Sequence, residues 1–103
     1  MHKLYVIVRS NLSKSQQAVQ AGHALAEWLL FTGSSHRWDN GTLVYLKVRD
    51  LEELTNLKNK LDEFEQWPVA FHEPDIGNEM TAFSVLETEH VSAMDLLKNL
   101  PLL

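Results

Sequence analysis

Four segments of the chain carry the hydrophobic pattern of β-strands. Residues 3–9, KLYVIVR, and residues 42–48, TLVYLKV, have apolar residues on both alternating sides of the chain, which is typical of strands covered on both faces. Residues 67–73, WPVAFHE, and residues 80–87, MTAFSVLE, flank a short loop, PDIGNE. Because so short a loop cannot hold a crossover helix, it predicts that the last two strands are antiparallel neighbours.

Helical periodicity is clearest after the second strand. Asp50 is expected to be an N-cap with Glu53 three residues later, and the segment DLEELTNLKNKLDEF repeats apolar residues at spacings of three and four. These apolar positions are Leu51, Leu54, Leu57, Leu61 and Phe64. A shorter terminal helix is expected in SAMDLLKNL, capped by Ser92 and stopped by Pro101.

Another helix is expected between the first two strands. Ser13 and Gln16 form an S-x-x-Q capping box, so this helix should begin near Ser13 and end around Thr32 and Gly33. The residues spaced to cover a sheet are Ala18, Ala21, Leu25, Trp28 and Leu29. Glycine inside a helix costs about 0.5–1 kcal/mol relative to alanine, so Gly22 predicts the close approach of a neighbouring backbone.

The predicted elements follow one another in the order β-α-β-α-β-β-α. Strands that alternate with helices indicate right-handed crossovers, and the final antiparallel pair makes the sheet a mixed one. A chain of 103 residues is long enough for one hydrophobic core but not for two. We therefore expect residues 1–103 to form a single α/β domain, with helices on the faces of a four-stranded sheet in a three-layer-like arrangement.

Composition and charge bear on the expected cellular location and on the expected binding partners. The chain is 45% hydrophobic and 22% charged and has no apolar run long enough to span a bilayer, so we expect no membrane association. The absence of cysteine fits the cytoplasm, which is where we place the protein. A net charge of -5 argues against indiscriminate nucleic-acid binding. The candidates for a local basic patch are Lys3, Arg9, Lys14, Arg37 and Lys47.

Three polar side chains share one face at the start of the first predicted helix. Gln16, Gln20 and His23 are spaced by four and by three residues, so they form a ridge. One interpretation makes Gln16 only a cap, Gln20 a solvated residue and His23 a buried imidazole bonded to a carbonyl. The other places the ridge along a cleft beyond the carboxyl end of the first strand, where open α/β sheets bind ligands.

A second polar group surrounds the loop between the last two strands. The segment FHEPDIGNEMTAF brings Glu73, Asp75 and Thr81 close together in sequence, near His72 and Glu79. Carboxylates and a hydroxyl at strand ends can position a water molecule, although a solvated acidic turn would have the same pattern. No pair of residues has a spacing characteristic of metal ligands, so we expect no metal site.

The tryptophans offer a further candidate contact, because indole rings stack on nucleic-acid bases. Trp28 is expected in the core. Trp38 lies beside Arg37 in the polar segment SSHRWDNG, so these two residues are candidates for binding a ligand.

The opening of the chain resembles that of the type 2 peptidyl-tRNA hydrolases. In that family a strand ending in V-V-R precedes a T/S-D-L segment, a lysine-containing helix start and the motif A-A-Q-x-x-H-A. The segment LYVIVRSNLSKSQQAVQAGHA matches this pattern at Val8, Arg9, Ser10, Leu12, Ala18, Gln20, His23 and Ala24. The family's order of strands and helices also agrees with the predicted order.

The resemblance implies hydrolysis of the ester that joins a peptide to the terminal ribose of tRNA, with no metal or organic cofactor. Lys14, near the helix start, would substitute for the family's lysine, while the family's acid corresponds to Glu73 or Asp75 and its strand threonine to Thr81 as oxyanion donor. Gln16, Gln20, His23, Arg37 and Trp38 would then contact peptidyl-tRNA, the expected partner.

Two departures from the family keep an alternative open. Gln16 stands at the position aligned with the family's lysine, and PDIGNE is shorter than the family's threonine-rich loop. The alternative is a non-catalytic binding protein of the same fold that has lost the lysine and the threonine loop. A scaffold that forms a homodimer through a sheet edge or a helix face is a third hypothesis.

Overall fold

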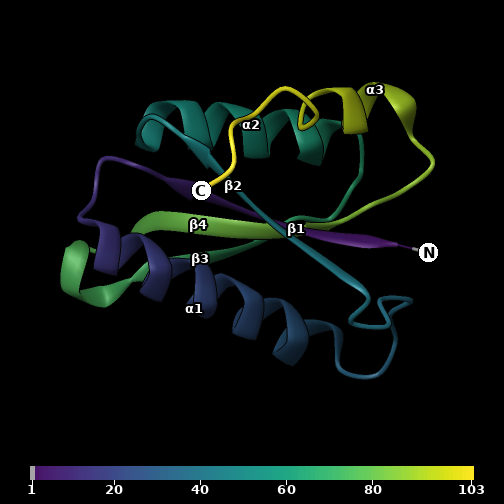
Figure 1. Cartoon of the computed structure of the whole chain (residues 1–103), viewed down its shortest axis with the longest axis horizontal. Coiled ribbons are helices and arrows are strands. Elements are labelled where there is room, and N and C mark those ends of the chain that lie inside the picture. Colours follow the sequence, from purple (N-terminus) through teal and green to yellow (C-terminus); the bar gives the residue numbers. More distant parts are fainter. Residues whose placement is uncertain (1) are drawn as a thin grey trace.

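The computed structural model describes residues 2–103 and confirms a single α/β domain built around a mixed four-stranded sheet (Figure 1). One helix lies on one face of the sheet and two helices lie on the other. The elements are β1 (Lys3–Arg9), α1 (Lys14–Thr32), β2 (Thr42–Val48), α2 (Leu51–Glu63), β3 (Val69–Glu73), a 3-10 turn (Pro74–Ile76), β4 (Glu79–Leu86) and α3 (Val91–Asp95).

The sheet has the strand order β2-β1-β4-β3. β1 pairs in parallel with β2 and antiparallel with β4, and β3 pairs antiparallel with β4, as the short loop predicted. The central position of β1 agrees with its apolar pattern on both sides, because Leu4, Val6, Ile7 and Val8 are all fully buried. No helix within residues 2–103 is long and apolar enough to cross a bilayer.

The two faces of the sheet are packed differently. On the α2 side, leucines of α2 pack with Ile7, Phe83 and Val85 in a core of large side chains. On the α1 side, Ala21 and Ala24 meet Val6, Val8 and Ala82 in a core of small ones. Small residues let α1 lie close to the sheet, so its polar residues come within hydrogen-bonding reach of the strands.

An irregularity in β4 places Thr81 on the α1 side. Phe71 pairs with Ala82, whereas the next residue of β3, His72, pairs with Met80. Thr81 is therefore an extra residue on β4, as in a β-bulge, which re-aims a side chain relative to strict alternation. As a result Thr81 and Ala82 both face α1, although they are adjacent in sequence.

The two outer edges of the sheet differ. The C-terminal segment lies along β2, where Lys47 N donates to the Pro101 carbonyl and Leu103 N donates to the Tyr45 carbonyl. No segment of residues 2–103 pairs with the outer edge of β3. The terminal helix is shorter than expected and begins elsewhere, because His90 rather than Ser92 caps it, with Nδ1 accepting from Ala93 N.

Gly22 does not have the role that its place in the helix predicted. It is exposed, and an added Cβ would meet no heavy atom within 4 Å, so no neighbouring backbone approaches it. Gly22→Ala should therefore raise the free energy of unfolding by about 0.5–1 kcal/mol, because alanine loses less backbone entropy in a helix. Urea denaturation measures this change. An unchanged or lower value would mean that the helix needs glycine there.

Candidate functional site

The candidate site is centred on Gln20, a fully buried amide on the sheet-facing side of α1. Gln20 Oε1 accepts a hydrogen bond of 2.6 Å from Thr81 Oγ1. Gln20 Nε2 donates to Glu73 Oε1 at 2.9 Å and to Gln16 Oε1 at 3.2 Å. All hydrogens of this amide are used, so its orientation is fixed by residues from α1, β3 and β4.

The burial of Gln20 excludes the interpretation that it is simply solvated. A buried amide without partners is unfavourable by several kcal/mol in an apolar medium, so such groups are retained where they are fully bonded. The polar ridge is thus divided, because Gln20 is buried whereas Gln16 and His23 are exposed. Gln16 is also only half of a capping box: Ser13 Oγ accepts from Gln16 N, but the Gln16 side chain contacts Gln20.

The acidic residues of the loop have different surroundings. Glu73 is the last residue of β3 and is partly exposed, with one carboxylate oxygen held by Gln20. Asp75 is exposed in the 3-10 turn that follows. Glu79 accepts from the nearly buried Arg9 at 2.8 Å, so Arg9 is not part of a basic patch. Of the predicted acids, Glu73 is the one that joins the Gln20 network.

His23 and Phe71 form an aromatic wall beside this network. The two rings are stacked, with centroids 4.4 Å apart and an angle of 7° between their planes. His23 is exposed, which excludes the buried, carbonyl-bonded imidazole considered from its position. Phe71 was not predicted as a site residue. Its position two residues before Glu73 could have indicated it, because alternate residues of a strand share a face.

The structure does not bring Lys14 together with Glu73 and Thr81. Lys14 lines a separate hollow of about 600 Å³, whose other lining residues are Ser10, Gln17, Ala18, Lys47 and Leu103. The network instead contains Gln16, which lies about 200° around the helix from Lys14. Among residues 2–103, Gln16 Nε2 has no hydrogen-bond partner.

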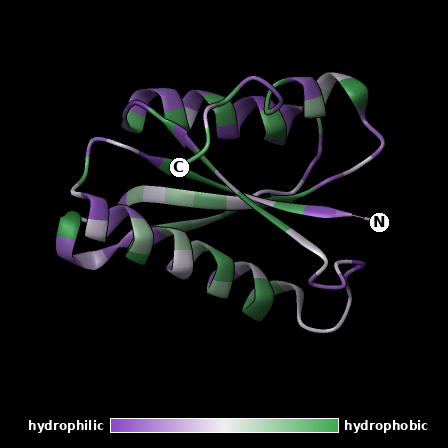
Figure 2. Ribbon diagram, in the orientation of Figure 1, coloured by the Kyte–Doolittle hydropathy of each residue, from purple (hydrophilic) through white to green (hydrophobic). Residues whose placement is uncertain are grey.

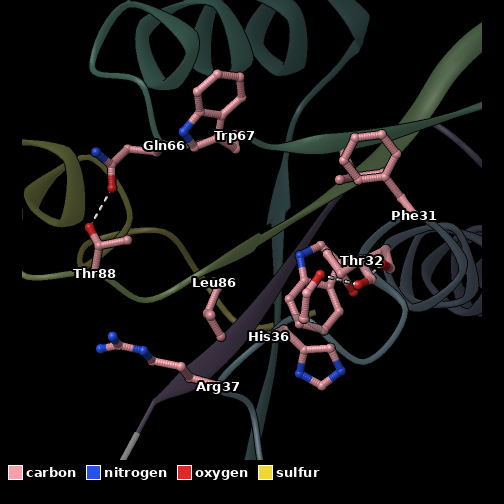
Figure 3. A pocket seen from close by; sticks show the side chains of 11 residues that line it. Phe31, Thr32, His36, Arg37, Gln66, Trp67, Leu86 and Thr88 are labelled. Carbon is pink, nitrogen blue, oxygen red and sulfur yellow. Dashed lines mark hydrogen bonds between the residues drawn. The ribbon is translucent and has the colours of Figure 1, made fainter.

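Arg37 and Trp38 lie beyond the C-terminal end of α1, at the opposite end of that helix from Gln16. Trp38 is partly buried, donates from Nε1 to the Thr42 carbonyl at 2.9 Å and meets Trp28 edge-on. Trp28 is buried, as expected. Arg37 lines a different hollow, shown in Figure 3. Neither residue is part of the Gln20 network.

No group of three or more histidine, aspartate or glutamate side chains within residues 2–103 is arranged to hold a metal ion. His72 lies on the α2 side of β3, where it lines a hollow with Lys58 and Asp62. Glu73 faces α1. The residues with metal-binding chemistry near the loop are thus divided between the two faces of the sheet.

Comparison with known proteins supports the fold. No protein-family model matches the chain, and no curated protein matches it in sequence. Among solved structures, the chain is similar to a protein of unknown function from Agrobacterium tumefaciens strain C58, with a TM-score of 0.70 and 15% sequence identity. The match covers 99% of this chain and 97% of the other. It therefore shows a shared fold over nearly the full length of both chains.

Proposed function

We propose that the protein hydrolyses the ester between peptide and tRNA, as a divergent member of the type 2 peptidyl-tRNA hydrolases acting in the cytoplasm. The observation that carries this proposal is the fixed carboxylate of Glu73. Gln20 holds one carboxylate oxygen, and Thr81 fixes Gln20 in turn. The match of Gln20, His23 and Thr81 to the family's pattern gives the network its proposed chemistry.

The proposed reaction needs a base for water and a donor for the developing oxyanion. Glu73 accepts a proton from water, and the water oxygen forms a bond to the ester carbonyl carbon. The tetrahedral oxyanion accepts a hydrogen bond from the unengaged Nε2 of Gln16, whose Oε1 accepts from the same Gln20 amide that holds Glu73. As the bond to the ribose oxygen breaks, Glu73 returns the proton to that oxygen.

The remaining residues position these groups. Gln20 holds the Glu73 carboxylate and Thr81 holds Gln20, so both residues orient the base without touching the substrate. The stacked rings of His23 and Phe71 offer an aromatic wall to the substrate. Thr81 is fully buried and directs its hydroxyl hydrogen at Gln20, so it is a positioning residue here rather than the oxyanion donor that the family's pattern implied.

The wild-type protein should release free tRNA from purified peptidyl-tRNA above the rate in buffer. Gln16→Ala should reduce kcat by about 10²-fold, which is the usual effect of removing one oxyanion donor. Lys14→Ala is the matched control on the same helix turn and should leave kcat unchanged. Gel separation of peptidyl-tRNA from free tRNA measures the rates of the wild type and of both variants. Loss of turnover in Lys14→Ala but not in Gln16→Ala would make Lys14, rather than Gln16, the residue that stabilises the oxyanion.

A second candidate function is binding without catalysis, in the same fold. The separation of Lys14 from Glu73 favours it, as does the net charge of -5. Titration of labelled tRNA at several salt concentrations distinguishes the two functions, because phosphate contacts weaken steeply as salt rises. Salt-sensitive binding without turnover would support the binding function. A protein that neither binds nor cleaves peptidyl-tRNA would contradict the hydrolase and leave a protein or a small molecule as the partner of the binding function.

A further inference from the structure

Three large apolar side chains are exposed at the C-terminal end of α1 and just before β3. Leu30 and Phe31, in the last turns of α1, are 79% and 76% exposed, and Trp67, two residues before β3, is 78% exposed. The last turns of α1 are coloured as hydrophobic in Figure 2. We call these three residues the apolar patch. Exposed apolar surface of this kind marks interaction sites when it is contiguous.

Phe31 and Trp67 of the apolar patch lie between two hollows. One, of about 340 Å³, includes Trp28 and Leu86 in its walls (Figure 3). The other, of about 310 Å³, includes Pro68 and Ala70. Phe31, Trp67 and Val69 line both hollows. The surface therefore combines protruding aromatic rings with apolar depressions beside them.

The backbone at Trp67 is held in an unusual conformation. Its φ is 58°, in the left-handed region that bulky residues rarely adopt. Such strain costs of order 1–3 kcal/mol and persists where the position has a use. Here the strained backbone carries an indole ring that is left exposed.

We infer that two copies of this chain associate through the apolar patch and the open edge of β3. A twofold contact uses the same surface on both copies, so Phe31 or Trp67 of one copy can fill a hollow of the other. The edge of β3 is also available, because the C-terminal segment covers the β2 edge and no segment of residues 2–103 covers β3. An uncovered edge is a template for pairing with another chain.

The charges near the patch permit a contact between identical surfaces. No carboxylate lines the larger hollow. In the smaller hollow, Asp62 is paired with Lys58 at 2.9 Å. Arg37 lines the larger hollow, and Figure 3 shows its guanidinium directed away from Phe31. The residues that line the two hollows therefore include no unpaired acid, despite the net charge of -5.

The available area suits a reversible dimer. An aromatic side chain buries about 150–250 Å² when it is covered, so Phe31 and Trp67 offer several hundred Å² in each copy. Leu30 and the walls of the hollows add to this area, and twofold symmetry doubles it. The total approaches the roughly 1,200 Å² at the lower limit of specific interfaces. We therefore expect micromolar rather than nanomolar dissociation constants.

Sedimentation velocity of the full chain over a range of micromolar concentrations tests this inference. The wild-type protein should pass from monomer to dimer as its concentration rises. Trp67→Asn and Phe31→Ser should each raise the dimer dissociation constant by about 30-fold or more, as expected for aromatic residues at the centre of an interface. Val91→Ser is the matched control, because Val91 is 71% exposed but lies in α3, outside the patch.

Asparagine at position 67 also separates loss of association from loss of folding. Asparagine tolerates a positive φ better than tryptophan, so Trp67→Asn should unfold at the same or a higher urea concentration while it stays monomeric. Phe31→Ser provides a second variant without any backbone strain. A wild-type protein that stays monomeric throughout the range overturns the inference. So does a dimer that survives both patch variants or that is weakened equally by Val91→Ser.

Discussion

Thr81→Val is expected to lower the free energy of unfolding by about 1–3 kcal/mol, the usual effect of leaving a buried polar group without its partner. Valine has nearly the shape of threonine but no hydroxyl, so the buried Gln20 Oε1 would lose its donor at 2.6 Å. Gln20→Leu is expected to destabilise at least as much, because it leaves both the Thr81 hydroxyl and Glu73 without the amide. Chemical denaturation measures both changes.

The double variant tests whether Gln20 and Thr81 act as a unit. If they do, Thr81→Val should destabilise the Gln20→Leu protein less than the wild type, with a coupling of about 0.5–3 kcal/mol. Ser84→Ala is the matched control. Ser84 is a buried hydroxyl on the same strand and face, but it donates to the Ala24 carbonyl at 2.9 Å. Its effect should add to that of Gln20→Leu, and additive effects for Thr81 as well would contradict the network.

The sequence predicted the fold because its local signals agree with the packing. β1 carries apolar residues on both sides, and both sides are covered by helices. Asp50 caps α2 by accepting from Glu53 N, as the spacing predicted. The loop PDIGNE is too short for a crossover, so β3 and β4 could only pair antiparallel. These features depend on neighbours in sequence, which is where pattern analysis is strongest.

The site was predicted less well because it depends on the sheet register and on the rotation of a helix. Alternation along β4 places Thr81 and Ala82 on opposite faces, and only the irregularity opposite Phe71 turns both toward α1. Nothing in the sequence marks that extra residue. Gln20 was recognised as a polar residue on a helix, but its burial depends on a bond to Thr81, which is 61 residues away.

The two candidate donors of α1 show the same limit. Lys14 and Gln16 are both near the start of the helix, and sequence alone left open which of them faces Glu73. The structure places Gln16 in the network and Lys14 beside Lys47 in another hollow. His90 illustrates a related error at α3, since an imidazole can accept from a backbone N–H where serine was expected to do so.

Glu73→Gln is expected to reduce the turnover of peptidyl-tRNA by about 10²–10⁴-fold, the usual contribution of a general base. The glutamine oxygen can still accept the hydrogen bond of Gln20 Nε2, so the network and the fold should persist. The amide of glutamine is too weak a base to take a proton from water near neutral pH. The variant therefore removes the proposed chemistry while it preserves the shape of the site.

Asp75→Asn is the matched control for this change. Asp75 is an exposed carboxylate two residues from Glu73, and it forms no hydrogen bond in the Gln20 network. Its replacement removes the same unit of negative charge near the site. Turnover by Asp75→Asn should stay near that of the wild type if Glu73 alone serves as the base.

The role of Glu73 is measured by the ratio of kcat for Glu73→Gln to kcat for the wild-type protein on the same peptidyl-tRNA preparation. We expect measurable turnover by the wild type, a ratio of about 10⁻² or lower and unchanged unfolding of the variant. Equal turnover by the two proteins, or no turnover by the wild type, would contradict the claim that Glu73 is the base of a peptidyl-tRNA hydrolase.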